Sequence, residues 1–198
     1  IAGLAGIPRV RQLDHGIGLM RPLLHCRRTT VLDYLQSLGQ PWQTDASNQD
    51  LQHMRNRIRQ QLLPQLQSQY QEGVQDALLR LAERAGEVQQ VLDLLTGDLM
   101  EQAVECREDD RQQQVRIDCQ ALATDQPHLV RELLVAIWKD QSWPRQAMGS
   151  QQWQRLAEMA TGNGSENGAP AVQSLPGRVE AKKEGESLWL TRPREKYS

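Results

Sequence analysis

The sequence predicts a mainly α-helical protein with a minor β component. Apolar residues recur at helical spacing over long stretches, and runs that alternate like strands are short and few. Phe is absent, so the core must come from Leu, Val, Ile, Ala and five Trp. With 198 residues, 38% apolar and 24% charged, the chain has room for one ordinary domain or two small ones.

The N-terminal part predicts a strand followed by a helix. The run GIGLMRPLL, residues 16–24, is typical of a strand that Pro22 ends or leaves at a sheet edge. In RRTTVLDYLQSLG, residues 27–39, the apolar side chains fall on one helical stripe, and Gly39 stands where a helix commonly stops. A strand-to-helix unit is therefore expected here.

A second helix is predicted between the turn TDASNQD, residues 44–50, and Pro64. Ser47 and Asp50 have the S-x-x-D spacing of a capping box, and Pro64 is expected to stop the helix. The helical period assigns its buried stripe to Leu51, Met54, Ile58 and Leu62.

One long helix is predicted for the middle of the chain. Its apolar residues recur at steps of four and three, at Val74, Leu78, Leu81, Ala85, Val88, Leu92, Leu95 and Leu99. Gly97 is expected to break this helix, because glycine in a helix interior costs about 1 kcal/mol relative to alanine. Packing of the seam within its own chain is favoured over an intermolecular coiled coil.

The last part of the chain predicts both strands and helices. VRIDCQAL, from Val115, alternates like a strand, and QPHLVRELLVAIWKDQ, residues 126–141, has the apolar stripe of a helix. A further helix is expected over residues 150–160 and a flexible loop over residues 161–170. The remainder predicts a small set of antiparallel hairpins.

Charge is unevenly distributed along the sequence. The net charge is +4 over residues 1–66, −8 over residues 67–126 and +2 over the remainder. The basic first third suggests an anionic partner there, whereas the acidic middle argues against a binding surface that extends over the whole chain.

Several kinds of chemistry have no signature in the sequence. There is no G-x-x-x-x-G-K-[ST], G-x-G-x-x-G or G-x-S-x-G motif, the three cysteines form no C-x-x-C, and the four histidines are dispersed. The acids of ECREDD, residues 105–110, are interpreted as a solvated cluster at a helix end. No catalytic residue and no metal site are therefore predicted. No stretch is long and apolar enough to span a membrane, and a reducing cytoplasm is expected.

The helix before Pro64 carries more arginine than capping and periodicity require. Arg55 and Arg59 are one turn apart, with Arg57 on the other flank, and Asn56 beside them can donate and accept hydrogen bonds. Two such guanidinium groups can hold phosphate groups bidentately. The alternative is that the arginines form salt bridges to the acidic middle segment or simply solvate a helix face.

Five motifs, taken in order, resemble the tRNA(Ile)-lysidine synthetase family. They are GLAGIP at residues 3–8, RPLL at 21–24, Arg28 with Tyr34, W-x-x-D-x-S-N at 42–48 and RNRIRQQLLP at 55–64. Beyond Pro64 the similarity lies in the architecture, with a long helical region and a less specific tail.

The resemblance implies an ATP-dependent ligase that acts on tRNA. Enzymes of this family adenylate C2 of the wobble cytidine of tRNA(Ile), after which the amine of free lysine displaces AMP and leaves lysidine. The implied partners are thus tRNA(Ile), lysine and ATP, and Mg²⁺ is expected with ATP. The resemblance favours Arg55, Asn56 and Arg59 as tRNA- or phosphate-binding residues; Arg21 is a weaker candidate that can instead anchor its loop.

One departure from the family pattern limits this expectation. The family's SGGxDS phosphate loop and its D-x-x-E-T helix lie upstream of GLAGIP and have no counterpart here. Residues 1–64 then correspond to the C-terminal remnant of an α/β ATP-pyrophosphatase-type domain, 65–112 to a helical linker region, and 113–198 to a small α+β domain. The chain alone is expected to be inactive.

A second interpretation stays open alongside the ligase. The chain can be a non-catalytic tRNA-binding fragment, or a vestigial scaffold that lost its chemistry. If it is a piece of the enzyme, apolar surface near Ile7, Ile17 and Leu23 is expected to be exposed, with a tendency to aggregate. The oligomeric state is not predicted.

Overall fold

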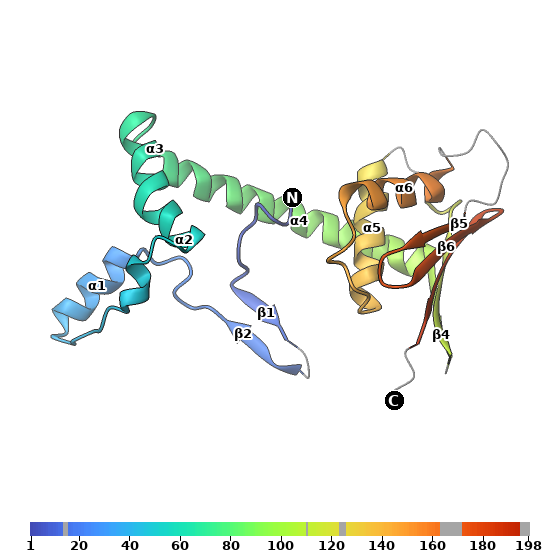
Figure 1. Ribbon diagram of the computed structural model, residues 1–198, viewed down its shortest axis with the longest axis horizontal. Coiled ribbons are helices and arrows are strands. Elements are labelled where there is room, and N and C mark those ends of the chain that lie inside the picture. Colours follow the sequence, from blue (N-terminus) through green and yellow to red (C-terminus); the bar gives the residue numbers. More distant parts are fainter. Residues whose placement is uncertain (14–15, 110, 123–125, 163–171, 195–198) are drawn as a thin grey trace. The chain divides into compact units, whose positions relative to one another are not determined.

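The computed structural model of the protein describes residues 1–13, 16–109, 111–122, 126–162 and 172–194. The chain divides into two compact units, Ile1–Gln89 and Gln90–Ser198. Helices outweigh strands (Figure 1), which confirms the mainly α class with a minor β component. Most of the predicted flexible loop, residues 163–170, lies outside the described part of the chain.

A two-stranded hairpin opens the first unit. β1 (Val10–Gln12) pairs with β2 (Gly18–Met20) in antiparallel register, and the N–H of Arg21 continues the pairing by donating to the carbonyl of Arg9 at 2.8 Å. β2 ends before Pro22, as predicted, whereas β1 has no counterpart in the sequence-based prediction. Both strands are exposed along their whole length.

α1 (Arg28–Ser37) is the first predicted helix. Gly39 has a φ of +64°, a left-handed conformation that glycine adopts without a steric penalty, so the predicted C-terminal stop is confirmed. α1 contains no fully buried residue, and Leu38 at the end of its apolar stripe is exposed.

The segment with three arginines is a continuous helical run of three parts: α2 (Met54–Arg57), the π turn η3 (Ile58–Leu62) and α3 (Leu63–Gln69). The predicted stop at Pro64 is wrong. The N–H of Leu63 donates to the carbonyl of Ile58, five residues back, and this wider turn immediately precedes the proline, which has no N–H to donate. The π turn thus allows the helix to continue through Pro64.

The predicted capping box is also wrong. Ser47 lies in a separate 3-10 turn, η2 (Ala46–Gln49), and the helix begins only after His53, whose side chain makes no capping bond. The Asp50 carboxylate accepts from the N–H of Gln52 at 2.8 Å instead of reaching a helix cap. The S-x-x-D spacing marks two successive short turns rather than a helix start.

The first unit has almost no core. Ala85 is the one buried apolar side chain among its described residues. The predicted buried stripe is therefore wrong: the side chains that compose it are 38% to 62% exposed, because no element of this unit covers Leu51, Met54, Ile58 and Leu62. Exposure of Ile7, Ile17 and Leu23 is confirmed, at 51% to 61%.

α4 (Val74–Ala103) is the predicted long helix, with 30 residues. It continues through Gly97, so the expected break is wrong; in a helix of this length the hydrogen bonds on both sides offset one unfavourable residue. Packing of the seam within the chain is only partial, and its preference over an intermolecular coiled coil stays a prediction. Ala85 is buried, but four seam residues are exposed, namely Leu78, Leu81, Val88 and Leu95.

The acidic run after α4 is not a helix end. β3 (Val104–Glu108) follows Ala103 directly and pairs with β4 (Gln112–Asp118), with Val104 opposite Ile117. Asp109 makes the turn, and its carboxylate accepts the N–H groups of Arg111 and Gln112, which lowers its pKa. The strand predicted from Val115 is confirmed as part of β4.

The second unit is built on an antiparallel sheet of five strands in the order β3-β4-β7-β6-β5. The predicted hairpins beyond residue 170 are confirmed as β5 (Val172–Leu175), β6 (Val179–Glu184) and β7 (Ser187–Pro193). The last strand lies between β4 and β6, which joins the N-terminal and C-terminal halves of this unit in one sheet.

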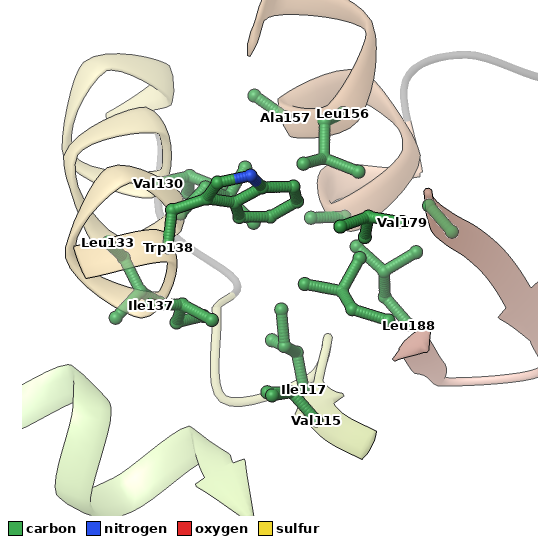
Figure 2. Packing of buried hydrophobic residues seen from close by; sticks show 14 of the residues in the cluster. Val115, Ile117, Val130, Leu133, Ile137, Trp138, Leu156, Ala157, Val179 and Leu188 are labelled. Carbon is green, nitrogen blue, oxygen red and sulfur yellow. The ribbon is translucent and has the colours of Figure 1, made fainter. Parts of the chain in front are cut away.

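Two helices cover the sheet and complete a real core. α5 (Pro127–Asp140) and α6 (Ser150–Thr161) confirm the predicted helices. Figure 2 shows Trp138 of α5 lying between α6 and the sheet residues. Its ring meets Trp143 and Trp153 edge to face, with centroids 4.9 and 5.2 Å apart.

Candidate functional site

A small cavity in the first unit collects residues from four elements. It has a volume of about 210 Å³ and is lined by Arg28, Asn48, Asn56, Arg59 and Gln60. Arg28 is the first residue of α1, Asn48 belongs to the turn η2, Asn56 lies on α2, and the remaining two lie on the π turn. The lining contains two guanidinium groups, three carboxamides and no carboxylate.

The turn that carries Asn48 is closed by its own hydrogen bonds. The Asp45 carboxylate accepts the N–H of Ser47 at 2.9 Å, and this bond lowers the pKa of Asp45. The N–H of Asn48 donates to the carbonyl of Asp45, and that of Asp50 to the carbonyl of Ser47, both at 3.1 Å. The turn is thereby a defined structure although Ser47, Asn48 and Gln49 are exposed.

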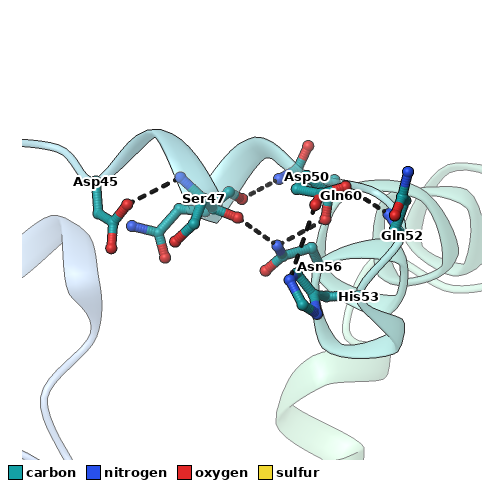
Figure 3. A network of polar contacts seen from close by, with 8 residues as sticks. Asp45, Ser47, Asp50, Gln52, His53, Asn56 and Gln60 are labelled. Atoms are coloured by element: carbon teal, nitrogen blue, oxygen red, sulfur yellow. Dashed lines mark hydrogen bonds and ion pairs between the residues drawn. The ribbon is translucent and has the colours of Figure 1, made fainter.

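Two carboxamides attach this turn to the helix. The Asn56 Nδ2 donates to the carbonyls of Ser47 and Asp50, at 2.9 and 2.8 Å (Figure 3), and the Gln60 Nε2 donates to the carbonyl of Asn48 at 2.7 Å. Asn56 is half-buried, and both of its amide hydrogens are used. Asn56 and Gln60 therefore hold the turn against the helix and set the position of Asn48.

The cavity carries uncompensated positive charge. Neither Arg28 nor Arg59 forms an ion pair with any carboxylate in the described part of the chain. By contrast, the neighbouring Arg27 is paired with Asp76 of α4 at 2.6 Å. Two guanidinium groups that lie on one cavity and lack a counter-ion favour an anionic ligand.

The predicted site residues fall into two groups. Arg59 and Asn56 line the cavity, whereas Arg55 does not, and the second guanidinium there belongs to Arg28. Arg21 donates from Nη1 to the carbonyl of Pro8 at 2.9 Å and thus anchors the segment before β1. The role of these residues in binding tRNA or phosphate stays a prediction.

The proposed salt bridges of the arginine-rich helix are not found among the described residues. Arg57 donates from Nη2 to the Sδ of Met54 at 3.5 Å, on its own helix, and no ion pair to the acidic middle segment involves Arg55, Arg57 or Arg59. Among the described residues of this unit, the one such bridge joins Asp76 to Arg27, the residue just before α1.

Sequence reasoning did not select Arg28, Asn48 and Gln60 as site residues. All three belong to motifs at characteristic spacing, Gln60 to RNRIRQQLLP, and this is the signal that was present. Their convergence depends on how the turn folds back onto the helix, and this is a tertiary feature.

The described residues contain neither a metal-binding cluster nor a membrane-spanning helix. No group of three or more His, Cys, Asp or Glu side chains there has the arrangement of a metal site. Within the same residues, no helix combines the length and the apolar character needed to cross a membrane.

A family model described as a PP-loop domain matches residues 1–66, the segment that contains the whole cavity. Similar curated proteins share one name, tRNA(Ile)-lysidine synthase. That of Rhodopirellula baltica is 34% identical over 172 residues, which cover 78% of this chain and 42% of the relative. Those of Pseudomonas putida and Pseudomonas syringae pv. tomato are 40% and 41% identical over 98 and 97 residues, about half of this chain and 22% and 21% of theirs.

These matches cover about half of this chain or more, but less than half of each relative. The alignment with the Rhodopirellula baltica protein covers 78% of the chain and so must continue beyond the segment matched by the PP-loop model. The chain spans about two fifths of the length of that relative, and about a fifth of each Pseudomonas protein. Over the segments that match, the chain is similar to proteins named tRNA(Ile)-lysidine synthase, with a PP-loop domain at residues 1–66.

Proposed function

We propose that this chain is part of a tRNA-modifying ligase that uses ATP to attach lysine to C2 of the wobble cytidine of tRNA(Ile). The single observation that carries the proposal is the cavity in which residues of three family motifs meet. Arg28 belongs to the motif that it forms with Tyr34, Asn48 ends W-x-x-D-x-S-N, and Arg59 lies in RNRIRQQLLP. When motifs that are separate in the sequence line one cavity, a shared role in binding a ligand is expected.

The proposed reaction places negative charge where cationic side chains are useful. The C2 oxygen of the cytidine attacks the α-phosphorus of ATP and releases pyrophosphate; the amine of lysine then attacks C2, loses a proton, and AMP leaves. Every partner except lysine carries phosphate groups, and fixed guanidinium groups stabilise such charge without reorganisation. In this proposal Arg28 and Arg59 bind phosphate, and Asn56 and Gln60 keep the binding turn in place.

The described residues supply binding groups rather than a complete catalytic centre. They include no cluster of acids or histidines that could hold Mg²⁺, so any Mg²⁺ would arrive with ATP and be held by groups outside this cavity. In this proposal the chain has three parts, residues 1–64, 65–112 and 113–198, and the last part contacts tRNA. The enzyme would act in the cytoplasm, where its substrates are available.

The proposal is tested by genetic replacement. The gene that encodes this chain, with all of its in-frame coding sequence, is expressed in bacteria from which the resident lysidine synthase is depleted, and lysidine in tRNA(Ile) is measured by mass spectrometry. Lysidine is expected with the unaltered gene and is reduced by Arg59→Ala. Absence of lysidine while the soluble protein accumulates would reject the ligase; retained tRNA(Ile) binding would then favour the non-catalytic tRNA-binding alternative.

A further inference from the structure

Arg28 is the second cation of the cavity, and it comes from a different element than Arg59. Neither guanidinium has a hydrogen-bond or ion-pair partner among the described side chains, and the same holds for the side chain of Asn48. The amide nitrogens of Asn56 and Gln60, the other two polar side chains of the lining, already donate to carbonyls of the turn. The groups free to bind a ligand are therefore two guanidiniums and one carboxamide.

The size of the cavity restricts the ligand. At about 210 Å³ it is smaller than the range of about 300–1,000 Å³ that is usual for sites enclosing a whole small molecule. A single phosphate group fits such a volume, whereas a complete nucleotide would extend beyond it. The planar guanidinium fork matches two phosphate oxygens at once, so two forks and an amide can engage most of the oxygens of one phosphate.

We infer that Arg28, Arg59 and Asn48 bind one phosphate group together, with Asn56 and Gln60 as positioning residues. This inference rests on the proposed function only for the source of the phosphate, which is either ATP or the backbone of tRNA. The two arginines that bind the phosphate come from different elements and not from one helix, because Arg55 does not line the cavity. Binding then requires α1, which carries Arg28, and the π turn, which carries Arg59, to keep their relative position.

The first measurement uses inorganic phosphate alone and is independent of tRNA. Phosphate is titrated into the full chain while the Nε–Hε resonances of its arginines are followed by NMR. Those of Arg28 and Arg59 are expected to shift together with one dissociation constant, and that of Arg57, which contacts Met54 and does not line the cavity, is not expected to shift. Shifts of all three to the same extent, or of none, would overturn the inference.

The second measurement identifies the source of the phosphate. Arg28→Ala and Arg59→Ala are each expected to weaken binding of the phosphate-bearing ligand by about ten- to a hundredfold, the range of one charge-assisted contact. If the two arginines hold the same phosphate, the double variant is little weaker than either single variant. Arg57→Ala on the same helix removes the same charge and serves as the matched control.

ATP and an unmodified tRNA(Ile) transcript give different results in this test. If the phosphate belongs to ATP, the single variants change the ATP dissociation constant alone. If it belongs to tRNA, they lower the slope of log affinity against log salt by about 0.7–0.9.

The two proposals fail in distinguishable ways. Joint phosphate shifts in this chain, together with no lysidine from its complete in-frame gene, would reject the ligase and keep the phosphate site. Binding of either ligand that the Arg28 and Arg59 variants leave equal to the Arg57 control would reject the phosphate site alone.

Discussion

Replacement of Asn56 by alanine tests whether the binding turn depends on the helix behind it. The substitution removes the two bonds to the carbonyls of Ser47 and Asp50, at 2.9 and 2.8 Å. Two neutral hydrogen bonds stabilise by about 1–3 kcal/mol in total. Because Asn56 is half-buried and water can reach the two carbonyls, the lower part of that range is expected, about 1–1.4 kcal/mol, which corresponds to a five- to tenfold larger open population of the turn.

Amide hydrogen exchange measures that population directly. The N–H groups of Asn48 and Asp50 close the turn and should exchange five to ten times faster in Asn56→Ala, whereas those of α5 should not change. Gln52→Ala is the control, because the Gln52 side chain has no hydrogen-bond partner in the described part of the chain. Equal exchange in Asn56→Ala and in the control would refute the role assigned to Asn56.

A carboxylate at this position gives a sharper version of the test. Asn56→Asp keeps the shape but turns a donor toward two carbonyl oxygens into an acceptor, so its effect at neutral pH should exceed that of alanine. Protonation at low pH restores one donor, and the turn should then partly recover. No dependence on pH would argue that the turn is held by other contacts.

Three further outcomes follow from the fold. Trp138→Ala should lower the free energy of unfolding of the second unit by about 3–5 kcal/mol, whereas alanine at the exposed Trp42 should change stability by no more than about 0.5 kcal/mol. Urea unfolding followed by circular dichroism compares the two variants, and equal losses of stability would contradict the assignment of Trp138 to the core. Gly97→Ala should stabilise α4 by about 0.5–1 kcal/mol, because nothing lies within 4 Å of the added Cβ; a loss of stability would speak against a regular helix there. The hydrogen bond from the N–H of Ser47 lowers the pKa of Asp45 in the folded protein. The bond therefore stabilises the fold above the ordinary pKa of 3.8, and this stabilisation is lost as the pH falls through the lowered folded-state pKa. An NMR titration of the Asp45 carboxylate with a midpoint at or above 3.8 would be inconsistent with this bond.

Local periodicity predicts most of the helices correctly. α1, α4, α5 and α6 follow from apolar spacing and stop signals, because each forms its hydrogen bonds within its own segment. The strand β3 could not be found this way. Its residues read as an acidic helix end, and they become a strand only because β4 offers them a partner.

The buried stripe of the arginine-rich helix shows a second limit. Its period is helical, and the helix exists, but burial also requires another surface to cover Ile58 and its neighbours. The same holds for the exposed half of the α4 seam. Periodicity indicates which face of a helix is apolar, and it does not indicate whether this chain supplies a surface to cover that face.

The sequence by itself determined the helical class, the order of the family motifs and the excess of arginine before Pro64, because these features depend on residues close together in the chain. Only the tertiary structure decided that Arg59 shares its cavity with Arg28 rather than Arg55. The reason is geometric: Asn56 and Gln60 bind the backbone of a turn many residues upstream, and the π turn changes the angular spacing along the helix. The spacing of residues along the sequence predicts neither these hydrogen bonds nor the π turn.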